Sequence, residues 1–190
     1  MKKLSFLSII FAILVVSCGG GTEYRDANKD TGSMEWGPRE IKTTVNKMVA
    51  DLYDYLKNDW KRPAILQVQK IRNRTSEHID TSMLANEMVT NLVQKRIRFI
   101  DDTYTKEAIA EMEMGMSGLI DPDSAVPMGD LKSPNFYLFG EISDNVRNVG
   151  SKRIQYIVVT MKLTSLQTRM LMWQQQQEFL KATTTNKVSF

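Results

Sequence analysis

Residues 70–81, with the sequence KIRNRTSEHIDT, concentrate the side chains of this chain that are best suited to binding or to acid–base chemistry. Lys70, Arg72, Arg74 and His78, the only histidine of the 190 residues, lie within nine positions. An apolar run precedes this basic loop and a helical pattern follows it, which predicts a loop between a strand and a helix. Such a loop can hold a phosphate, exchange protons or contact another protein.

A phosphate site at a strand–helix junction normally uses glycines, because backbone N–H groups must approach the anion closely. The basic loop contains no glycine, so a dedicated nucleotide site is disfavoured. Ser76 lies two residues before His78, which is not the arrangement of a catalytic triad, and the chain has no glycine-flanked nucleophile elbow. We therefore interpret His78 as an exposed loop residue.

Metal binding requires several His, Cys or carboxylate ligands in one cluster. The carboxylate pairs of this sequence are poorly placed for it, because Asp101 and Asp102 end a predicted strand while Asp121 and Asp123 flank a proline in a turn. No metal site, no cofactor and no catalytic residue are predicted. The chain is not expected to be an enzyme.

Residues 1–17 have the features of a signal peptide. A positive start, MKK, precedes an apolar run of about 13 residues, which is short of the roughly 20 that a membrane-spanning helix needs. The sequence VVSC at its end resembles the lipobox of bacterial lipoproteins. That resemblance implies cleavage before Cys18 and acylation of its thiol and amine, and two or more acyl chains anchor a protein stably.

Cys18 is also the only cysteine, so an exported domain has no partner for an internal disulfide. Gly19 follows it, where lipoproteins that stay in the inner membrane of enteric bacteria carry an aspartate. The expected location is the outer membrane, with the protein anchored by lipid on the periplasmic face.

The charge balance argues against nucleic acid as a partner. The formal net charge is +3, and loss of Lys2 and Lys3 with the signal peptide would leave 23 basic against 22 acidic groups. Nucleic-acid binding favours a clearly basic domain. Residues 18–37, the lipidated cysteine and a glycine- and charge-rich stretch, are predicted to form a flexible tether of about 25 Å root-mean-square span, or about 60 Å fully extended.

Residues 38–190 are predicted to form one globular domain of the α/β class, with a mixed β-sheet flanked by helices and a C-terminal antiparallel hairpin. Apolar spacing predicts helices and strands in alternation. The expected helices are 38–58, a second one capped by Asp80 or Thr81, and 106–116, and the expected strands are 64–71, 97–101, 136–143, 153–166 and 171–181. The methionines of residues 111–116 are expected to fill core, and Gln174–Gln177 to lie on an edge strand.

Three blocks of the sequence carry a family resemblance. Residues 71–84, IRNRTSEHIDTSML, closely resemble the IRNRT…IDT signature of LpoB-type lipoproteins, which activate bifunctional penicillin-binding proteins. FYLFGEIS resembles a strand of that family, and MKLTSLQTRMLMWQQQQEFLK resembles its C-terminal hairpin, although Arg169 stands where the family's turn has glycine. The last block is similar also to TolB amino-terminal and CsgG-like domains.

The resemblance implies a non-catalytic domain that binds a noncatalytic regulatory module of a bifunctional, class A penicillin-binding protein and activates it allosterically. Such activation requires a binding energy that differs between the synthase's active and inactive states. Arg72, Asn73 and Arg74 match the family block and His78 stands where the pattern differs; these four are the candidate partner-binding residues. In the alternative interpretation, Asn73 and Thr75 only hold the loop conformation while both arginines are solvated.

Two other function classes remain open. The hairpin's likeness to CsgG-like domains favours a non-catalytic subunit of an envelope secretion or assembly complex, but no long alternating segment suited to a membrane barrel is evident. A small-ligand or nucleotide enzyme is disfavoured by the glycine-free loop. The short tether adds a constraint, because the partner must then project toward the outer membrane, lie in a narrow envelope, or be a different protein.

Overall fold

The computed structural model describes residues 25–29, 33 and 35–184. The predicted signal peptide, Cys18 with its lipidation and most of the predicted tether lie outside the described residues. The elements are η1 (Ala27–Lys29), α2 (Pro38–Asp54), η2 (Tyr55–Trp60), β1 (Ile65–Val68), β2 (Arg72–Arg74), α3 (Thr81–Gln94), β3 (Arg98–Phe99), α4 (Thr105–Met116), β4 (Phe136–Val149), β5 (Lys152–Ser165) and β6 (Leu171–Thr184).

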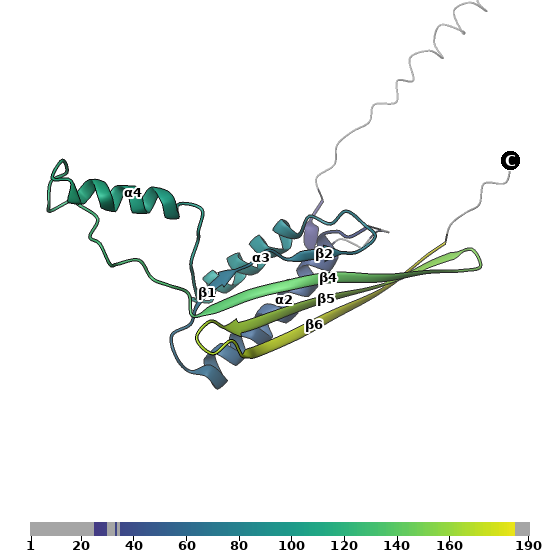
Figure 1. The fold of residues 1–190 in the computed structure, drawn as a ribbon. Coiled ribbons are helices and arrows are strands. Elements are labelled where there is room, and N and C mark those ends of the chain that lie inside the picture. The colour runs from purple at the N-terminus through teal and green to yellow at the C-terminus, as the bar shows by residue number, and fades with distance from the viewer. Residues whose placement is uncertain (1–24, 30–32, 34, 185–190) are drawn as a thin grey trace, which may run out of the picture.

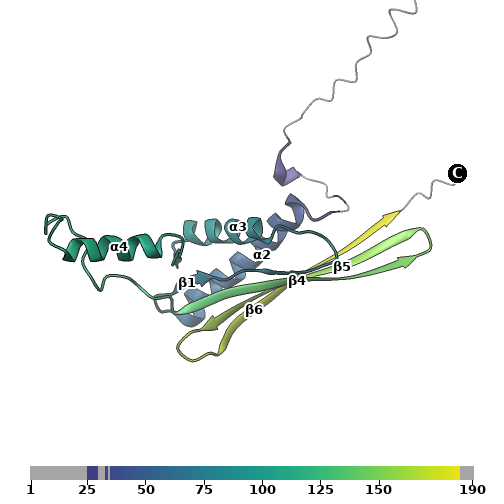
Figure 2. The same ribbon diagram turned by 45° about the horizontal axis from the view of Figure 1, so that its top comes forward.

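The strands form one mixed sheet in the order β3-β1-β4-β5-β6, and β2 adds a short parallel pairing to β4. β1 is parallel to β3 and β4, whereas β4, β5 and β6 form an antiparallel meander. Helices α2 and α3 cover one face, and the other face is open (Figures 1 and 2). The predicted α/β fold with a mixed sheet and a C-terminal hairpin is confirmed.

Local sequence explains where α2 begins and ends. Pro38 occupies its first turn, where a missing N–H costs nothing, and the N–H of Gly37 donates to Glu40 Oε2 at 3.0 Å. Val45, Met48 and Leu52 follow at helical spacing and are fully buried. The helix continues as the π-helical η2 and ends at Lys61, whose φ is 55°.

The core lies between these helices and the covered face of the sheet. Buried apolar side chains from α2, α3 and the three long strands make up one cluster, and Trp60 meets Phe136 edge-on, with ring centroids 4.9 Å apart. Full burial of one such side chain contributes about 1.5–3 kcal/mol. This packing holds in place the sheet whose strand β4 pairs with the basic loop.

Three predictions of local structure were wrong. The basic loop contains a strand, β2, and β4 and β5 run through residues 144–149 and 152, so that only Gly150 and Ser151 form the turn. In both places most side chains are polar, so the sequence shows no strand pattern. The strand forms because the backbone of a neighbouring strand supplies its hydrogen bonds. The strand predicted at 97–101 is limited to β3.

The sheet's last strand confirms the prediction for the glutamine run. β6 is an edge strand, and Gln174 and Gln176 are exposed on it, with Gln176 Nε2 donating to Thr160 Oγ1 at 3.0 Å. The turn before it contains Arg169 with a φ of 61°, in the left-handed region that favours glycine. Its N–H donates to the Ser165 carbonyl at 2.8 Å, which closes the turn.

Candidate functional site

The arginines of the basic loop stand on strand β2, at the side of β4. Arg72 is in register with Glu141 and Arg74 with Ser143, while Asn73 is in register with buried Ile142. Register partners of a sheet share a face. Arg72 and Arg74 are therefore on the open face, where Arg74 Nε lies 3.1 Å from Glu141 Oε2.

The side chain of Asn73 organises the loop internally. Its Nδ2 donates to the Glu77 carbonyl at 2.8 Å, and its Oδ1 accepts from the Thr75 N–H at 2.9 Å and from Thr75 Oγ1 at 2.7 Å. Thr75 Oγ1 also lies 3.0 Å from the Glu77 carbonyl. Both polar ends of Asn73 are thus used within the loop, as the structural interpretation of this residue requires.

Asp144 fastens the loop to the long hairpin. Its carboxylate accepts from the Ser76 N–H at 3.1 Å, from Ser76 Oγ at 2.7 Å and from Gln155 Nε2 at 2.8 Å. Partial burial opposes ionisation of this carboxyl, but these hydrogen bonds outweigh it and lower the pKa of Asp144. Arg153 and Glu77 add an ion pair at 3.6 Å, so the loop is held from both β4 and β5.

The end of the loop is set by helix α3. Of the two residues predicted for its cap, Asp80 is the N-cap and accepts from the Ser82 N–H at 2.9 Å. Hydrogen bonds from Ser82 lower the pKa of Asp80. Thr81 Oγ1 donates to the Ile71 carbonyl at 2.9 Å and so joins the two ends of the loop. The loop is consequently preorganised.

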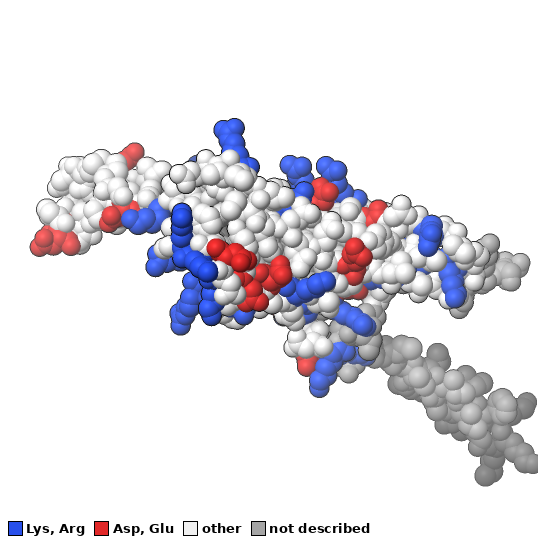
Figure 3. All heavy atoms as spheres, turned by 90° about the horizontal axis from the view of Figure 1, so that it is seen from below, with Lys and Arg blue, Asp and Glu red and all other residues white. Residues whose placement is uncertain are grey.

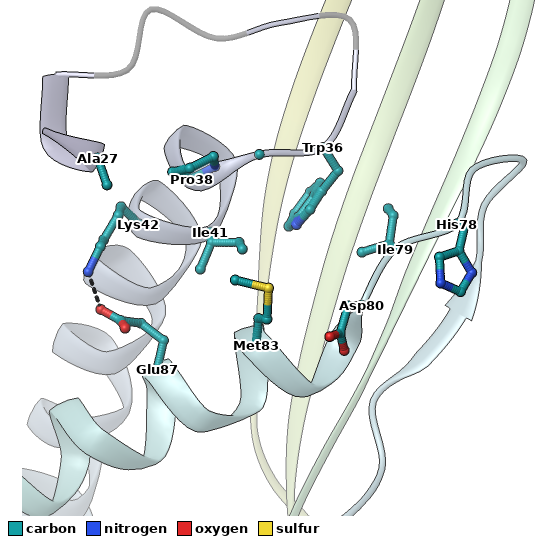
Figure 4. Close-up of a pocket in the computed structure, with 11 residues that line it drawn as sticks. Ala27, Trp36, Pro38, Ile41, Lys42, His78, Ile79, Asp80, Met83 and Glu87 are labelled. Atoms are coloured by element: carbon teal, nitrogen blue, oxygen red, sulfur yellow. Dashed lines mark hydrogen bonds and ion pairs between the residues drawn. The ribbon is translucent and has the colours of Figure 1, made fainter. Parts of the chain in front are cut away.

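His78 is exposed, as predicted, but it lies apart from the arginines, at the rim of an apolar pocket on the helix side (Figure 4). The pocket has a volume of about 380 Å³. Trp36, Ile41, Ile79 and Met83 contribute its apolar lining, and an ion pair of 2.5 Å between Lys42 Nζ and Glu87 Oε1 borders it (Figure 4).

Trp36 is the residue of this pocket that sequence reasoning missed, because it was assigned to the tether. Its ring packs edge-on against Phe179, with centroids 5.8 Å apart, and its indole N–H is buried without an acceptor among the described residues. The available signal was its position directly before Gly37, from which a hydrophobic side chain reaches the helix's fourth residue, Ile41.

Lys181 holds this N-terminal segment to the end of β6. Its Nζ lies 2.8 Å from Glu40 Oε1 and donates to the carbonyl of Glu35 at 2.6 Å and to that of Ser33 at 3.4 Å. The Lys181 and Glu40 side chains are only 13% and 5% exposed. The contacts of the folded domain therefore begin before the boundary predicted at Pro38, and they include η1, which lies against α2 and contributes Ala27 to the apolar pocket.

A second hollow, of about 320 Å³, lies on the open face beside Arg74's partner Glu141. It runs across β4, β5 and β6 and is lined by residues such as Ser143, Lys162 and Gln174. The four predicted contact residues are thus divided: Arg72 and Arg74 stand near this polar hollow, Asn73 is occupied within the loop, and His78 borders the apolar pocket. Asp144 and Gln155, which hold the loop, were not predicted.

These surfaces can bind and position a partner. Ser76 Oγ is hydrogen-bonded to Asp144 and not to His78, so the loop holds no nucleophile–base pair. Among residues 25–29, 33 and 35–184, no group of three His, Cys, Asp or Glu side chains could hold a metal ion. None of the helices in this described part is long and apolar enough to cross a membrane.

The fold and the site define a two-layer α/β domain with a fixed polar loop beside its central strand. The family model described as peptidoglycan-synthase activator LpoB matches residues 40–179. The chain therefore belongs to the LpoB family, a family of regulatory activators of peptidoglycan synthesis. This confirms the resemblance seen in residues 71–84, and places the protein in that general role.

Solved structures similar to this chain include two of LpoB and one of a lipoprotein from another organism. The LpoB C-terminal domain from Salmonella enterica is 15% identical, with 73% of this chain and 94% of that chain covered and a TM-score of 0.42. The NMR structure of Escherichia coli LpoB is 14% identical, with 88% and 84% covered and a TM-score of 0.38. Lipoprotein GNA1162 from Neisseria meningitidis is 12% identical, with 66% and 88% covered and a TM-score of 0.39. No curated protein sequence matches the chain.

Proposed function

We propose that this protein is an outer-membrane-anchored lipoprotein that binds and allosterically activates a bifunctional, class A penicillin-binding protein. The observation that carries the proposal is the family match over residues 40–179, which includes the basic loop. The loop is fixed by Asn73 and Asp144, and it leaves Arg72 and Arg74 exposed on the open face. Arginine is well suited to anchoring such an interface.

A fixed loop is an efficient docking element. Ordering a free loop on binding costs about 0.5–1.5 kcal/mol for each side chain immobilised, and that cost reduces affinity. Here residues 73–77 are already ordered by hydrogen bonds to each other and to Asp144. For activation to follow, these contacts must be stronger with the active state of the synthase than with its inactive state.

The anchoring part of the proposal rests on residues 1–18, a signal peptide followed by the acylated Cys18. Because η1 contacts α2 and Lys181 holds Ser33 and Glu35, the stretch that separates the proposed anchor from the first described contact of the domain is Cys18 to Ala27. At full extension those residues span roughly 30 Å. The regulatory module of the synthase must therefore project to within that distance, plus the length of the domain, of the outer membrane.

The test uses an unlipidated chain that begins at Gly19, which keeps every described residue. It is used to capture partners from detergent-solubilised envelopes and is then added to a lipid II polymerisation assay with the captured synthase. Activation predicts faster polymerisation and crosslinking. A failure to bind any class A synthase contradicts the proposal, whereas capture of secretion components would favour the assembly-complex alternative.

The loop's part in binding is tested by the double variant Arg72→Glu with Arg74→Glu. We expect affinity for the synthase to fall by about tenfold or more with an unchanged melting temperature, because both side chains are exposed. The matched control is Arg147→Glu with Lys152→Glu, which makes the same charge change on exposed residues at the hairpin tip. Equal affinity of a folded loop variant and this control would remove the loop from the interface.

A further inference from the structure

Residues 101–134, hereafter the excursion, leave the body of the domain and carry α4 away from it (Figures 1 and 2). α4 makes few contacts with the other helices and strands, and its buried residue, Met112, is not part of the main core cluster. The prediction that the methionines of 111–116 fill core was wrong for Met114 and Met116, which are exposed, whereas Met112 is buried but outside the main core cluster. α4 is therefore a helix with an uncovered surface.

The uncovered surface of the excursion is both acidic and apolar. Of its charged residues, eight are acidic and two are basic. Tyr104, Glu107, Glu111 and Met114 follow each other at intervals of three, four and three, which puts them on one side of α4, hereafter the docking face. Tyr104 is 70% exposed and Met114 50% exposed, and they flank the two exposed carboxylates.

A complementary hollow, hereafter the basic pocket, lies where η2 ends and β1 and β3 begin. Its volume is about 350 Å³. Leu56, Ala64 and Ile97 supply apolar groups, no Asp or Glu lines it, and its cations are Lys57, Arg62, Arg96 and Arg98. None of these four cations pairs with a carboxylate in the described part of the chain. Figure 3 shows Lys and Arg side chains gathered on the body next to the excursion.

The backbone around the basic pocket is held in costly conformations. Lys61 and Arg96 have φ of 55° and 67°, although the left-handed region costs a non-glycine residue about 1–2 kcal/mol. The turn that precedes Lys61, η2, is π-helical, a form that recurs at functional sites. Helix C-termini attract cations, which accounts for basic residues here but leaves their charge without a counter-ion. Backbone strain and cations without a carboxylate partner are thus found together at the basic pocket.

We propose that the docking face of one copy of this chain binds the basic pocket of a second copy. Glu107 and Glu111 would meet the four cations, and Tyr104 and Met114 would cover the apolar groups of the pocket. A second copy is the occupant that the molecule itself specifies, because the same chain carries both complementary surfaces and α4 stands clear of its own body. Two such contacts related by a two-fold axis close a dimer.

The first experiment measures the mass of the unlipidated chain from Gly19 by sedimentation over a range of concentrations. We expect a concentration-dependent dimer at about 0.1 M salt that dissociates at about 1 M salt, where the Debye length falls to about 3 Å. A monomer at every concentration overturns the proposal. So does a dimer that high salt leaves intact, since the contact proposed is electrostatic.

Charge reversal tests which surfaces make the dimer. A pocket variant carries Arg62→Glu with Arg98→Glu, a helix variant carries Glu107→Lys with Glu111→Lys, and all four positions are exposed. Each variant alone should bind itself at least about tenfold more weakly, because like charges then face each other. The control pair Arg147→Glu with Lys152→Glu should still dimerise. A pocket variant or helix variant that dimerises like the unaltered chain overturns the proposal.

Mixing the two variants gives the decisive measurement. In a mixed dimer the unaltered helix of the pocket variant meets an unaltered pocket, and the lysines of the helix variant meet glutamates, so both contacts are complementary. We expect the mixture to form heterodimers although neither variant forms homodimers. Folded variants that stay monomeric when mixed overturn the proposal. Synthase binding by these variants is a separate readout, so this proposal and the proposed function can fail independently.

Discussion

The basic loop and the excursion are both polar segments outside the core, but they differ in how they are attached to the domain. The loop has little regular structure of its own, yet side-chain hydrogen bonds through Asn73, Ser76 and Asp144 tie it to the sheet. The excursion contains a regular helix of 12 residues, yet that helix has few contacts with the body. Regular secondary structure and attachment to the domain are therefore independent properties here.

The difference bears on how each region binds. A surface that is ordered before binding loses little conformational freedom on contact, so its affinity follows directly from the contacts made. A surface on a weakly attached element has to be fixed when it docks, and this lowers affinity while extending reach. The basic loop is therefore suited to a specific contact with a partner, and the excursion is suited to a weaker, reversible contact.

The largest expected effect on stability comes from removing the hydrogen bonds that attach the basic loop to the sheet. Asp144→Ala removes three hydrogen bonds and leaves Gln155, 2% exposed, without its acceptor. We expect the free energy of unfolding to fall by about 2–4 kcal/mol, because one buried donor loses its acceptor and two further hydrogen bonds to a carboxylate are removed. Denaturant unfolding measures it, and hydrogen exchange should quicken in residues 73–77. An unchanged exchange rate there would show that the loop is held by other contacts.

A smaller effect on the attachment of the basic loop is expected when low pH protonates Asp144. The pKa of Asp144 in the folded protein is below its ordinary value of 3.8, so its contribution to stability is complete above that value and is lost as the pH falls through the folded pKa. Loop protection against hydrogen exchange should therefore decline only below about pH 3.8. The matched variant Asp144→Asn cannot titrate, and a loop that responds to acid equally in both proteins would contradict this account.

The smallest effect is expected from removing the excursion. Its ends lie on the two sides of β1, where the Ile100 N–H donates to the Leu66 carbonyl at 2.8 Å and the Asn135 N–H to the Ile65 carbonyl at 2.9 Å. Two strand spacings, about 10 Å, separate such positions, so a short Gly/Ser linker can replace residues 102–133. Unfolding should stay cooperative, with stability unchanged or raised by about 1 kcal/mol through the shorter loop. A large loss of stability would place the excursion within the core.

Sequence patterns predicted best the elements whose side chains decide their structure. Buried residues at helical spacing predicted α2 and α3, and the Asp80 cap fixed where α3 begins. β2 was missed because Arg72, Asn73 and Arg74 are all exposed, and their strand depends on the edge that β4 offers. The extension of β4 through residues 144–149 was missed for the same reason.

The arrangement of the basic loop was predicted only where its residues act locally. The sequence indicated that Arg72, Arg74 and His78 are exposed, and it allowed that Asn73 holds the loop; the role of these residues in binding stays a prediction. It could not indicate Asp144 or Lys181, since their partners lie 68 and 146 residues away, in Ser76 and Glu35. Nor could the helical pattern of residues 105–116 show that α4 stands away from the body, because an amphipathic pattern does not name the surface that covers it.

The Lys181 contacts also determine how the domain would carry a mechanical load. After the contact of η1 with α2, a pull on the N-terminal segment reaches the body at the end of β6, where Lys181 holds the Glu35 carbonyl and the Glu40 carboxylate. The force is therefore delivered beside the sheet's edge strand and the start of α2, rather than at the basic loop or α4. Tension on the N-terminal segment would therefore act on the ion pair between Lys181 and Glu40, while the basic loop and the docking face of α4 keep their conformations.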